Sequence, residues 1–219
     1  MHLKPAPFLE RLVEANGLHE KHFHTWVFHP GMLFHSMLKW WGSGGERPTP
    51  HEGIDICYYR NRAGALQQLG AAAMIPVMYA GEVVQVVDDH LGRTVIVGHQ
   101  LDDGKDKRLH TFYGHAAELT SVRIGSLVAA NQIIATLSDA RQKNKALASH
   151  LHLTAAWVPQ GHPPSQLNWK RLQGSAVVLV DPLMLLQCSY ELLEERYDAA
   201  AEAAVRPPMN RARSGGEHY

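Results

Sequence analysis

Apolar residues near the start of the chain recur with the period of a helix. In the run Phe8-Leu9-Glu10-Arg11-Leu12-Val13-Glu14 they are interspersed with charged residues, so residues 7–16 are predicted to form a short amphipathic helix. A second helix is expected over residues 189–205, where leucines and acidic residues lead into an Ala-rich run that ends before Pro207. The residues after it are predicted to form a disordered tail.

Between these two segments the pattern changes to short stretches rich in Val, Ile, Tyr and Thr, many of them separated by Gly, Asp, Asn or Pro. Several short strands at this spacing are typical of a sandwich or barrel, so the predicted fold is mainly β and antiparallel. Gly81 and Gly125 each begin a similar stretch, which hints at internal duplication. The predicted strands cover residues 54–59, 82–87, 94–97, 109–113, 122–128, 132–137, 151–157 and 176–180.

The chain of 219 residues is long enough for one well-buried domain with an extension at each end. We expect an N-terminal extension at 1–45, a central domain at 46–187, and a C-terminal helix with its tail at 188–219. The aromatic residues of the first extension are expected to pack against the domain, and its histidines to bind no metal. A further hypothesis is that this extension covers a groove and restrains activity.

Charge and composition exclude several classes of protein. Lys plus Arg equals Asp plus Glu at 21 each, whereas a nucleic-acid binder needs a basic excess. No uncharged stretch is long and apolar enough to suggest a membrane span, and no signal-peptide pattern is visible. As written, the chain is expected in the cytoplasm, or in the periplasm or outside the cell if it is exported by another route or begins elsewhere. Cys57 and Cys188 do not form a disulfide framework and are each expected to be a small buried residue.

Histidine is the unusual residue, with 15 copies, and imidazole is both the commonest metal ligand and the usual acid–base group near neutral pH. In a strand, His150 and His152 would point to one face while Leu151 points to the core. His51 and Asp55, four residues apart, also share a face, and Gly53 between them permits a close approach. Imidazole and carboxylate together suit Zn²⁺, which accepts mixed nitrogen and oxygen ligands.

His115, in Tyr113-Gly114-His115, is expected at the end of a strand and says little by itself. Taken in chain order, however, His-x-x-x-Asp, Tyr-x-His and His-x-His resemble the motifs of the lysostaphin-type (LytM-type) zinc endopeptidases of peptidoglycan. The resemblance runs from about His51 to Asp181-Pro182-Leu183. It implies the duplicated hybrid β fold of that family, with short helical extensions added here at both ends.

The same resemblance implies that His51, Asp55 and His152 bind Zn²⁺ and leave a fourth position open to water or substrate. It implies that His150 is the general base, and that His115 orients the water and stabilises the oxyanion. The expected substrate is a peptide of peptidoglycan or another peptide. The stretch 139–149 lacks the glycines usual in the family, and its Arg and Lys residues are expected to favour acidic groups on the substrate.

Two other functions remain open from the sequence. One is a catalytically silent member of the same fold that binds wall peptide or regulates another hydrolase. The other is phosphotransfer, because phosphocarrier domains of sugar transport share this β fold and use facing histidines. The complete set of five site residues disfavours the first, and Asp55 together with the His-x-His disfavours the second.

Overall fold

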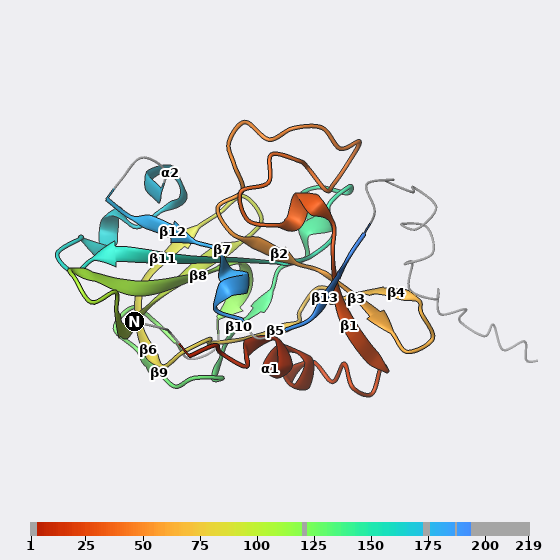
Figure 1. Ribbon diagram of the computed structural model, residues 1–219, viewed down its shortest axis with the longest axis horizontal. Coiled ribbons are helices and arrows are strands. Elements are labelled where there is room, and N and C mark those ends of the chain that lie inside the picture. Colours follow the sequence, from red (N-terminus) through yellow and green to blue (C-terminus); the bar gives the residue numbers. More distant parts are fainter. Residues whose placement is uncertain (1–3, 120–121, 173–175, 187, 194–219) are drawn as a thin grey trace, which may run out of the picture.

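The computed structural model describes residues 4–119, 122–172, 176–186 and 188–193 (Figure 1). Within these ranges thirteen strands form two sheets, and all but one of the paired ladders are antiparallel. The mainly β fold class is therefore confirmed. The described helices, α1 (Phe8–Ala15) and α2 (Trp169–Leu172), are too short to cross a membrane.

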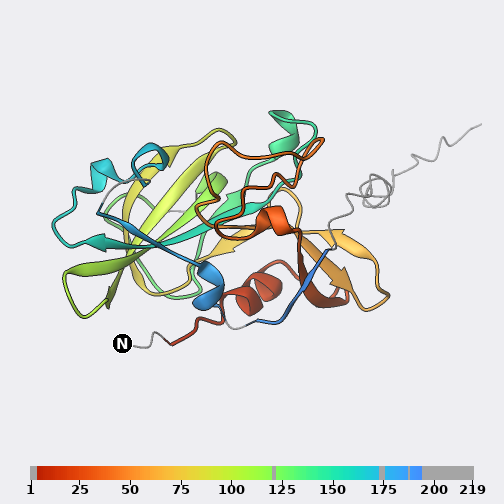
Figure 2. The ribbon, with the colours of Figure 1, turned by 45° about the horizontal axis from the view of Figure 1, so that its top comes forward.

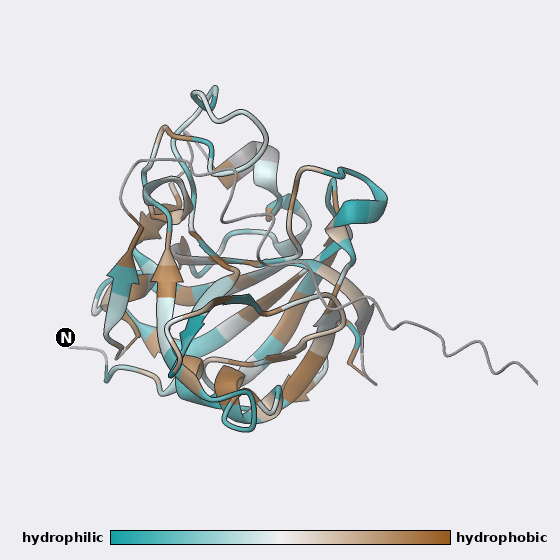
Figure 3. Ribbon diagram, turned by 90° about the vertical axis from the view of Figure 1, so that its right-hand side faces the viewer, coloured by the Kyte–Doolittle hydropathy of each residue, from teal (hydrophilic) through white to brown (hydrophobic). Residues whose placement is uncertain are grey.

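The larger sheet forms the body of the molecule and carries the long central strands. Its main path runs β12-β11-β8-β7-β6-β9, while β2 pairs with β11, and β10 pairs with both β5 and β8. Its strands are β2 (Ile54–Ile56), β5 (Met74–Pro76), β6 (Gly81–Asp88), β7 (Arg93–Asp102), β8 (Lys107–Leu119), β9 (Leu127–Val128), β10 (Ile133–Leu137), β11 (Leu151–Pro159) and β12 (Val178–Val180). In Figure 3 hydrophobic and paler segments follow one another along these strands, and the central strands β7 and β11 bury consecutive residues, so both of their faces are covered.

The smaller sheet has the order β13-β1-β3-β4, with β1 (Phe23–Phe28), β3 (Tyr58–Asn61), β4 (Leu66–Gln68) and β13 (Tyr190–Leu192). The predicted helix at 189–205 is wrong over 190–192, and its residues from 194 onward lie outside the described residues. Strand β13 instead pairs in parallel with β1, and Glu191 forms an ion pair with Arg60 on β3. These contacts join distant segments, so local helical spacing could not predict them.

The predicted strand at 54–59 is in fact two strands separated at Cys57. Strand β2 pairs with β11 in the larger sheet, whereas β3 pairs with β1 and β4 in the smaller one. The predicted strand at 122–128 is reduced to β9. Cys57 is buried as expected, but Cys188 is half-buried, and both thiols are free.

The predicted N-terminal helix is confirmed as α1, which buries Phe8, Leu9, Leu12 and Val13. Phe8 packs against Tyr113 of β8 with ring centroids 6.2 Å apart, so the helix shares one core with the central strands. Helix α1 lies below the sheet in Figures 1 and 2, and the segment after η1 (Pro30–Met32) loops over the opposite side. The predicted domain boundaries at residues 45 and 187 stay predictions.

Gly53 fixes how closely β2 approaches β11. A Cβ at this position would lie 2.2 Å from the carbonyl oxygen of Leu153 and 2.6 Å from Oγ1 of Thr154. Only a residue without a side chain fits there, which explains the close approach expected from the sequence. The same approach sets Asp55 opposite His152 in the ladder.

Replacing Gly53 with Ala should therefore push β2 away from β11. We expect Gly53→Ala to lower the free energy of unfolding by about 1–3 kcal/mol, the usual cost of overpacking. Chemical denaturation followed by circular dichroism measures this change. Gly161→Ala is the matched control, because a Cβ at Gly161 would meet nothing within 4 Å. Equal stability of the two variants would contradict the packing argument.

Candidate metal centre and catalytic site

Strand pairing brings three of the predicted site residues together at one end of the larger sheet. Asp55 on β2 lies opposite His152 on β11, and His152 lies opposite Gly114 on β8. His51 reaches the same point from the turn that precedes β2. The side chains of these residues are almost fully buried, so their polar atoms must find partners within the protein.

Three inner atoms face one another at this point. Nε2 of His51 lies 3.2 Å from Oδ1 of Asp55 and 3.1 Å from Nδ1 of His152, and Oδ1 of Asp55 lies 2.8 Å from that Nδ1. The outer nitrogens are also engaged: Nδ1 of His51 with the Leu33 carbonyl oxygen at 3.0 Å, and Nε2 of His152 with Oγ1 of Thr154 at 3.0 Å.

This donor set fits a zinc ion. When both imidazoles donate their outer N–H groups to those oxygens, the three inner atoms all present lone pairs to the same point. Zinc bonds of about 2.0–2.2 Å in a tetrahedral arrangement would set such atoms about 3.3–3.5 Å apart, close to the spacing observed. His51, Asp55 and His152 could therefore hold a metal ion.

The second oxygen of Asp55 is held by residues that the sequence did not single out. Nε1 of Trp40 donates to Oδ2 at 2.6 Å, and an Nη of Arg47 lies 3.4 Å from the same oxygen. Burial alone would raise the pKa of the Asp55 carboxyl. The surrounding imidazoles, His51 first, outweigh burial and hold this pKa well below its usual range, so the carboxyl is ionised.

His150 lies beside this group and points into it. Its Nε2 is 3.7 Å from Oδ1 of Asp55, while its Nδ1 contacts the Ala148 carbonyl oxygen at 2.8 Å. Burial lowers the pKa of His150 to about 3, so the ring is neutral near pH 7. With Nδ1–H donated to Ala148, a neutral His150 has a free lone pair on Nε2. The expectation that His150 and His152 share a face, with Leu151 in the core, is confirmed.

His115 reaches the site because of a bulge in β8. The pairing of β7 with β8 shifts between Tyr113 and Ala116, and His115 has a φ of 64°, which is rare for residues other than glycine. Bulges commonly redirect a side chain next to a functional site. The His115 ring centroid lies 4.7 Å from that of His150. The sequence expected His115 at a strand end, but β8 continues through it to Leu119.

Asp89, which the sequence analysis missed, fixes the orientation of His115. Its Oδ1 lies 3.1 Å from Nδ1 of His115, and its Oδ2 accepts the His115 backbone N–H at 2.9 Å. The same carboxylate accepts the N–H groups of Leu91 and Gly92 and the hydroxyl of Thr94. A second set of possible metal ligands lies close together here: Asp89, His90 and His115. The hydrogen bonds just described, however, already use both Asp89 oxygens.

A cavity of about 240 Å³ opens onto the site. Besides the site residues, its lining comes from the loop after η1, the turn between β6 and β7, the loop before β11 and the start of α2. Leu147 is the residue of the stretch 139–149 that lines this cavity. The cationic side chain in the lining is Arg47, which lies outside that stretch. The lining residues are Trp41, Arg47, Glu52, Asp55, His90, His115, Leu147, His150, His152 and Trp169.

All five predicted site residues are thus brought together. Trp40, Arg47 and Asp89 were missed because they act through contacts between distant segments. The Asp89–Gly92 turn was a usable signal for Asp89, since an Asp that begins a turn often accepts backbone N–H groups. Trp40 was interpreted only as a packing residue.

Sequence comparison assigns the family. The model of peptidase family M23 matches residues 49–163, more than half of the chain, so the protein belongs to peptidase family M23. Members of this family are in general zinc-dependent peptidases, and the lysostaphin-type resemblance is confirmed. No curated protein matches the chain.

Several solved structures resemble the fold. A putative peptidase M23 from Pseudomonas aeruginosa is 18% identical, with 83% of this chain and 62% of that chain covered and a TM-score of 0.41. The catalytic domain of the antimicrobial peptidase lysostaphin from Staphylococcus simulans is 14% identical, with 77% and 94% covered and a TM-score of 0.40. The chain therefore spans less than two thirds of the Pseudomonas aeruginosa protein.

Replacing Asp89 with Asn should destabilise the bulge, because an amide NH₂ group would face backbone donors. We expect Asp89→Asn to lower the free energy of unfolding at pH 7 by about 1–3 kcal/mol. Burial would raise the pKa of Asp89, but the hydrogen bond and charge of His115 hold it far below its usual range. The stability that Asp89 contributes is therefore present at neutral pH and declines as the pH falls below about 4.

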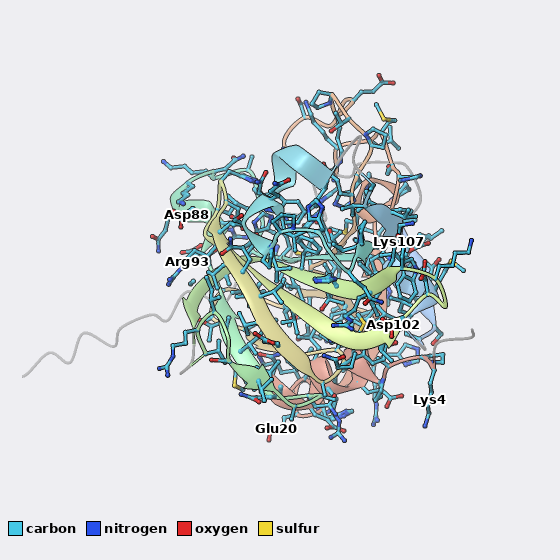
Figure 4. All side chains as sticks on the ribbon, turned by 90° about the vertical axis from the view of Figure 1, so that its left-hand side faces the viewer. Lys4, Glu20, Asp88, Arg93, Asp102 and Lys107 are labelled. Carbon is cyan, nitrogen blue, oxygen red and sulfur yellow. The ribbon has the colours of Figure 1, made fainter. Side chains whose placement is uncertain are left out.

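Denaturation curves at pH 7 and pH 3 measure both effects, and the two proteins should differ less at pH 3. Asp88→Asn is the matched control, since Asp88 is exposed at the periphery beside Arg93 (Figure 4) and should change stability by less than about 0.5 kcal/mol. A loss of stability for Asp88→Asn equal to that for Asp89→Asn would contradict the role given to Asp89.

Proposed function

We propose that the protein is a zinc metallopeptidase that hydrolyses peptide bonds in peptidoglycan cross-links or stem peptides. The observation that carries this proposal is the convergence of three buried donor atoms, on His51, Asp55 and His152, beside two further imidazoles that open onto a cavity. Membership of peptidase family M23 supports the reaction class.

In this proposal His51 Nε2, Asp55 Oδ1 and His152 Nδ1 hold the ion. Bound Zn²⁺ supplies a Lewis acid that polarises the scissile carbonyl and lowers the pKa of water towards about 7. The Leu33 carbonyl and the Thr154 hydroxyl fix the two imidazoles from behind. Such outer contacts set the tautomer and the ring orientation of metal-binding histidines.

His150 is the proposed general base. Its Nδ1–H is donated to the Ala148 carbonyl, so Nε2 faces the cavity with a free lone pair that accepts a proton from the attacking water. His115 is proposed to orient that water and to stabilise the oxyanion of the tetrahedral intermediate. The Asp89 carboxylate behind Nδ1 stabilises the imidazolium form of His115, which carries a proton on each ring nitrogen and can therefore donate from Nε2 to the oxyanion.

A peptide is the substrate class that this arrangement suits. The donor set and the two imidazoles serve hydrolysis of an amide, and the cavity beside them is lined by Trp41, Trp169 and Arg47. Aromatic faces pack against peptide groups and small side chains, and a guanidinium binds carboxylates such as those of stem peptides. The balanced net charge gives no basis for a nucleic-acid substrate.

Zinc content and wall-peptide hydrolysis, measured on the same samples, test the proposal. Purified protein should bind about one Zn²⁺ per chain and release peptides from peptidoglycan sacculi, detected by mass spectrometry. His51→Ala, Asp55→Ala and His152→Ala should lose both properties. His150→Ala and His115→Ala should keep zinc but hydrolyse about 10²–10⁴-fold more slowly.

His19→Ala is the control for loss of a histidine, because His19 is exposed and lies outside the lining of this cavity. It should keep both zinc and activity. A folded wild-type protein without zinc affinity would overturn the proposal. Bound zinc without cleavage of any wall peptide would establish instead a catalytically silent member of the family.

A further inference from the structure

A segment that lies entirely before the family match contacts the candidate metal centre. Residues 30–48, here called the strap, precede the matched range and loop over the sheet on the side opposite α1 (Figure 1). The strap folds back on itself: Lys39 N–H donates to the Gly45 carbonyl at 2.8 Å, and Arg47 N–H to the Met37 carbonyl at 2.7 Å. It is therefore an ordered loop and not a loose extension.

The strap holds the backbone and the ring of His51. His35 N–H donates to the His51 carbonyl at 2.9 Å, and His51 N–H donates to the Ser36 carbonyl at 3.1 Å. The Leu33 carbonyl, just before these residues, accepts from Nδ1 of His51. The position of His51, a proposed metal ligand, thus depends on Leu33, His35 and Ser36 of the strap.

The strap also holds the outer oxygen of Asp55 through Trp40. The distance of 2.6 Å from Nε1 to Oδ2 is short for an N–H donor, as expected when the acceptor is a buried carboxylate. The Trp40 ring is 4% exposed and meets the His150 ring edge-on, with centroids 5.0 Å apart. One side chain therefore contacts both a proposed metal ligand and the proposed general base.

Arg47 stabilises the conformation of the strap in which Trp40 contacts Asp55. Its guanidinium donates to the carbonyl oxygens of Gly31 at 2.8 Å and Leu38 at 3.0 Å. It stacks on the Trp41 ring at 4.6 Å and lies 3.4 Å from Oδ2 of Asp55. The Arg47 guanidinium thus links Gly31, at the start of the strap, to Leu38 in its middle, directly beside the Asp55 carboxylate.

We propose that Trp40 is a positioning residue of the metal centre, whose indole N–H holds Oδ2 of Asp55 so that the carboxylate offers only Oδ1 to the ion. This inference rests on the zinc site of the proposed function. A carboxylate with both oxygens free can rotate and bind an ion through both of them. With Oδ2 held by Trp40, Asp55 would offer a bound ion one oxygen and would leave a position open for water or substrate.

The test is the zinc affinity of Trp40→Phe, which keeps an aromatic ring but removes the N–H donor. Competition with a chromogenic chelator should show a dissociation constant raised about 10–100-fold, the usual effect of losing an outer contact of a metal ligand. The Co²⁺-substituted protein gives a second readout. Its visible absorption should weaken in Trp40→Phe, because a two-oxygen carboxylate raises the coordination number.

Trp26→Phe is the matched control. Trp26 is also a buried tryptophan, 3% exposed, but it packs against Phe23 and Tyr59 in the smaller sheet, away from Asp55. It should cost stability without changing zinc affinity or the Co²⁺ spectrum. If Trp40→Phe folds poorly, replacement of Trp40 by 3-benzothienylalanine removes the N–H while keeping the shape of the ring system, and should give the same loss of affinity.

The outcomes separate the two proposals. Failure of the wild-type protein to bind zinc would overturn the proposed function and this inference together. Wild-type zinc binding and hydrolysis, with an unchanged dissociation constant and Co²⁺ spectrum after removal of the Trp40 N–H, would overturn this inference alone. A loss of affinity equal to that of Trp26→Phe would likewise overturn it, because the effect would then come from packing.

Discussion

The negative charge of Asp55, which is almost entirely removed from solvent, is the constraint around which the site is arranged. A buried carboxylate is tolerated only when hydrogen bonds and opposite charge compensate for lost hydration. The compensation comes from separate parts of the chain: Trp40 and Arg47 of the strap, His51 of the following turn, and His152 of β11. Because each part contributes a contact to one group, displacing any of them disturbs the others.

The larger sheet provides the rigid frame for this arrangement. Gly53 lets β2 lie directly against β11, and the resulting register sets Asp55 opposite His152. The bulge in β8 then turns His115 towards His150, and Asp89 holds the bulge by accepting its backbone and ring N–H groups. Asp55, His115 and His152 are thus fixed on neighbouring strands, while His51 and His150 lie just before strands β2 and β11 and are held by backbone carbonyls, which favours a preorganised site.

Much of the fold followed from local pattern, and the exceptions have one cause. Helix α1 and most strands of the larger sheet were predicted, because α1 has apolar residues at helical spacing and the strands are short runs rich in Val, Ile, Tyr and Thr. Tyr190 to Leu192 formed a strand and not a helix, because an edge of β1 was available for pairing. Cys57 separates two strands because its neighbours pair with different partners. Pairing between distant segments overrides local preference in each case.

The sequence by itself identified the candidate donor residues and their order along the chain. His51 with Asp55, and His150 with His152, are close in the chain, so the geometry of one turn or one strand already sets each pair on a common face. Only the tertiary structure decided how the pairs meet and what stands behind them. Trp40 lies 15 residues from Asp55, and Asp89 lies 26 residues from His115. Contacts over such separations depend on how the sheet and the strap pack, and no local periodicity specifies them.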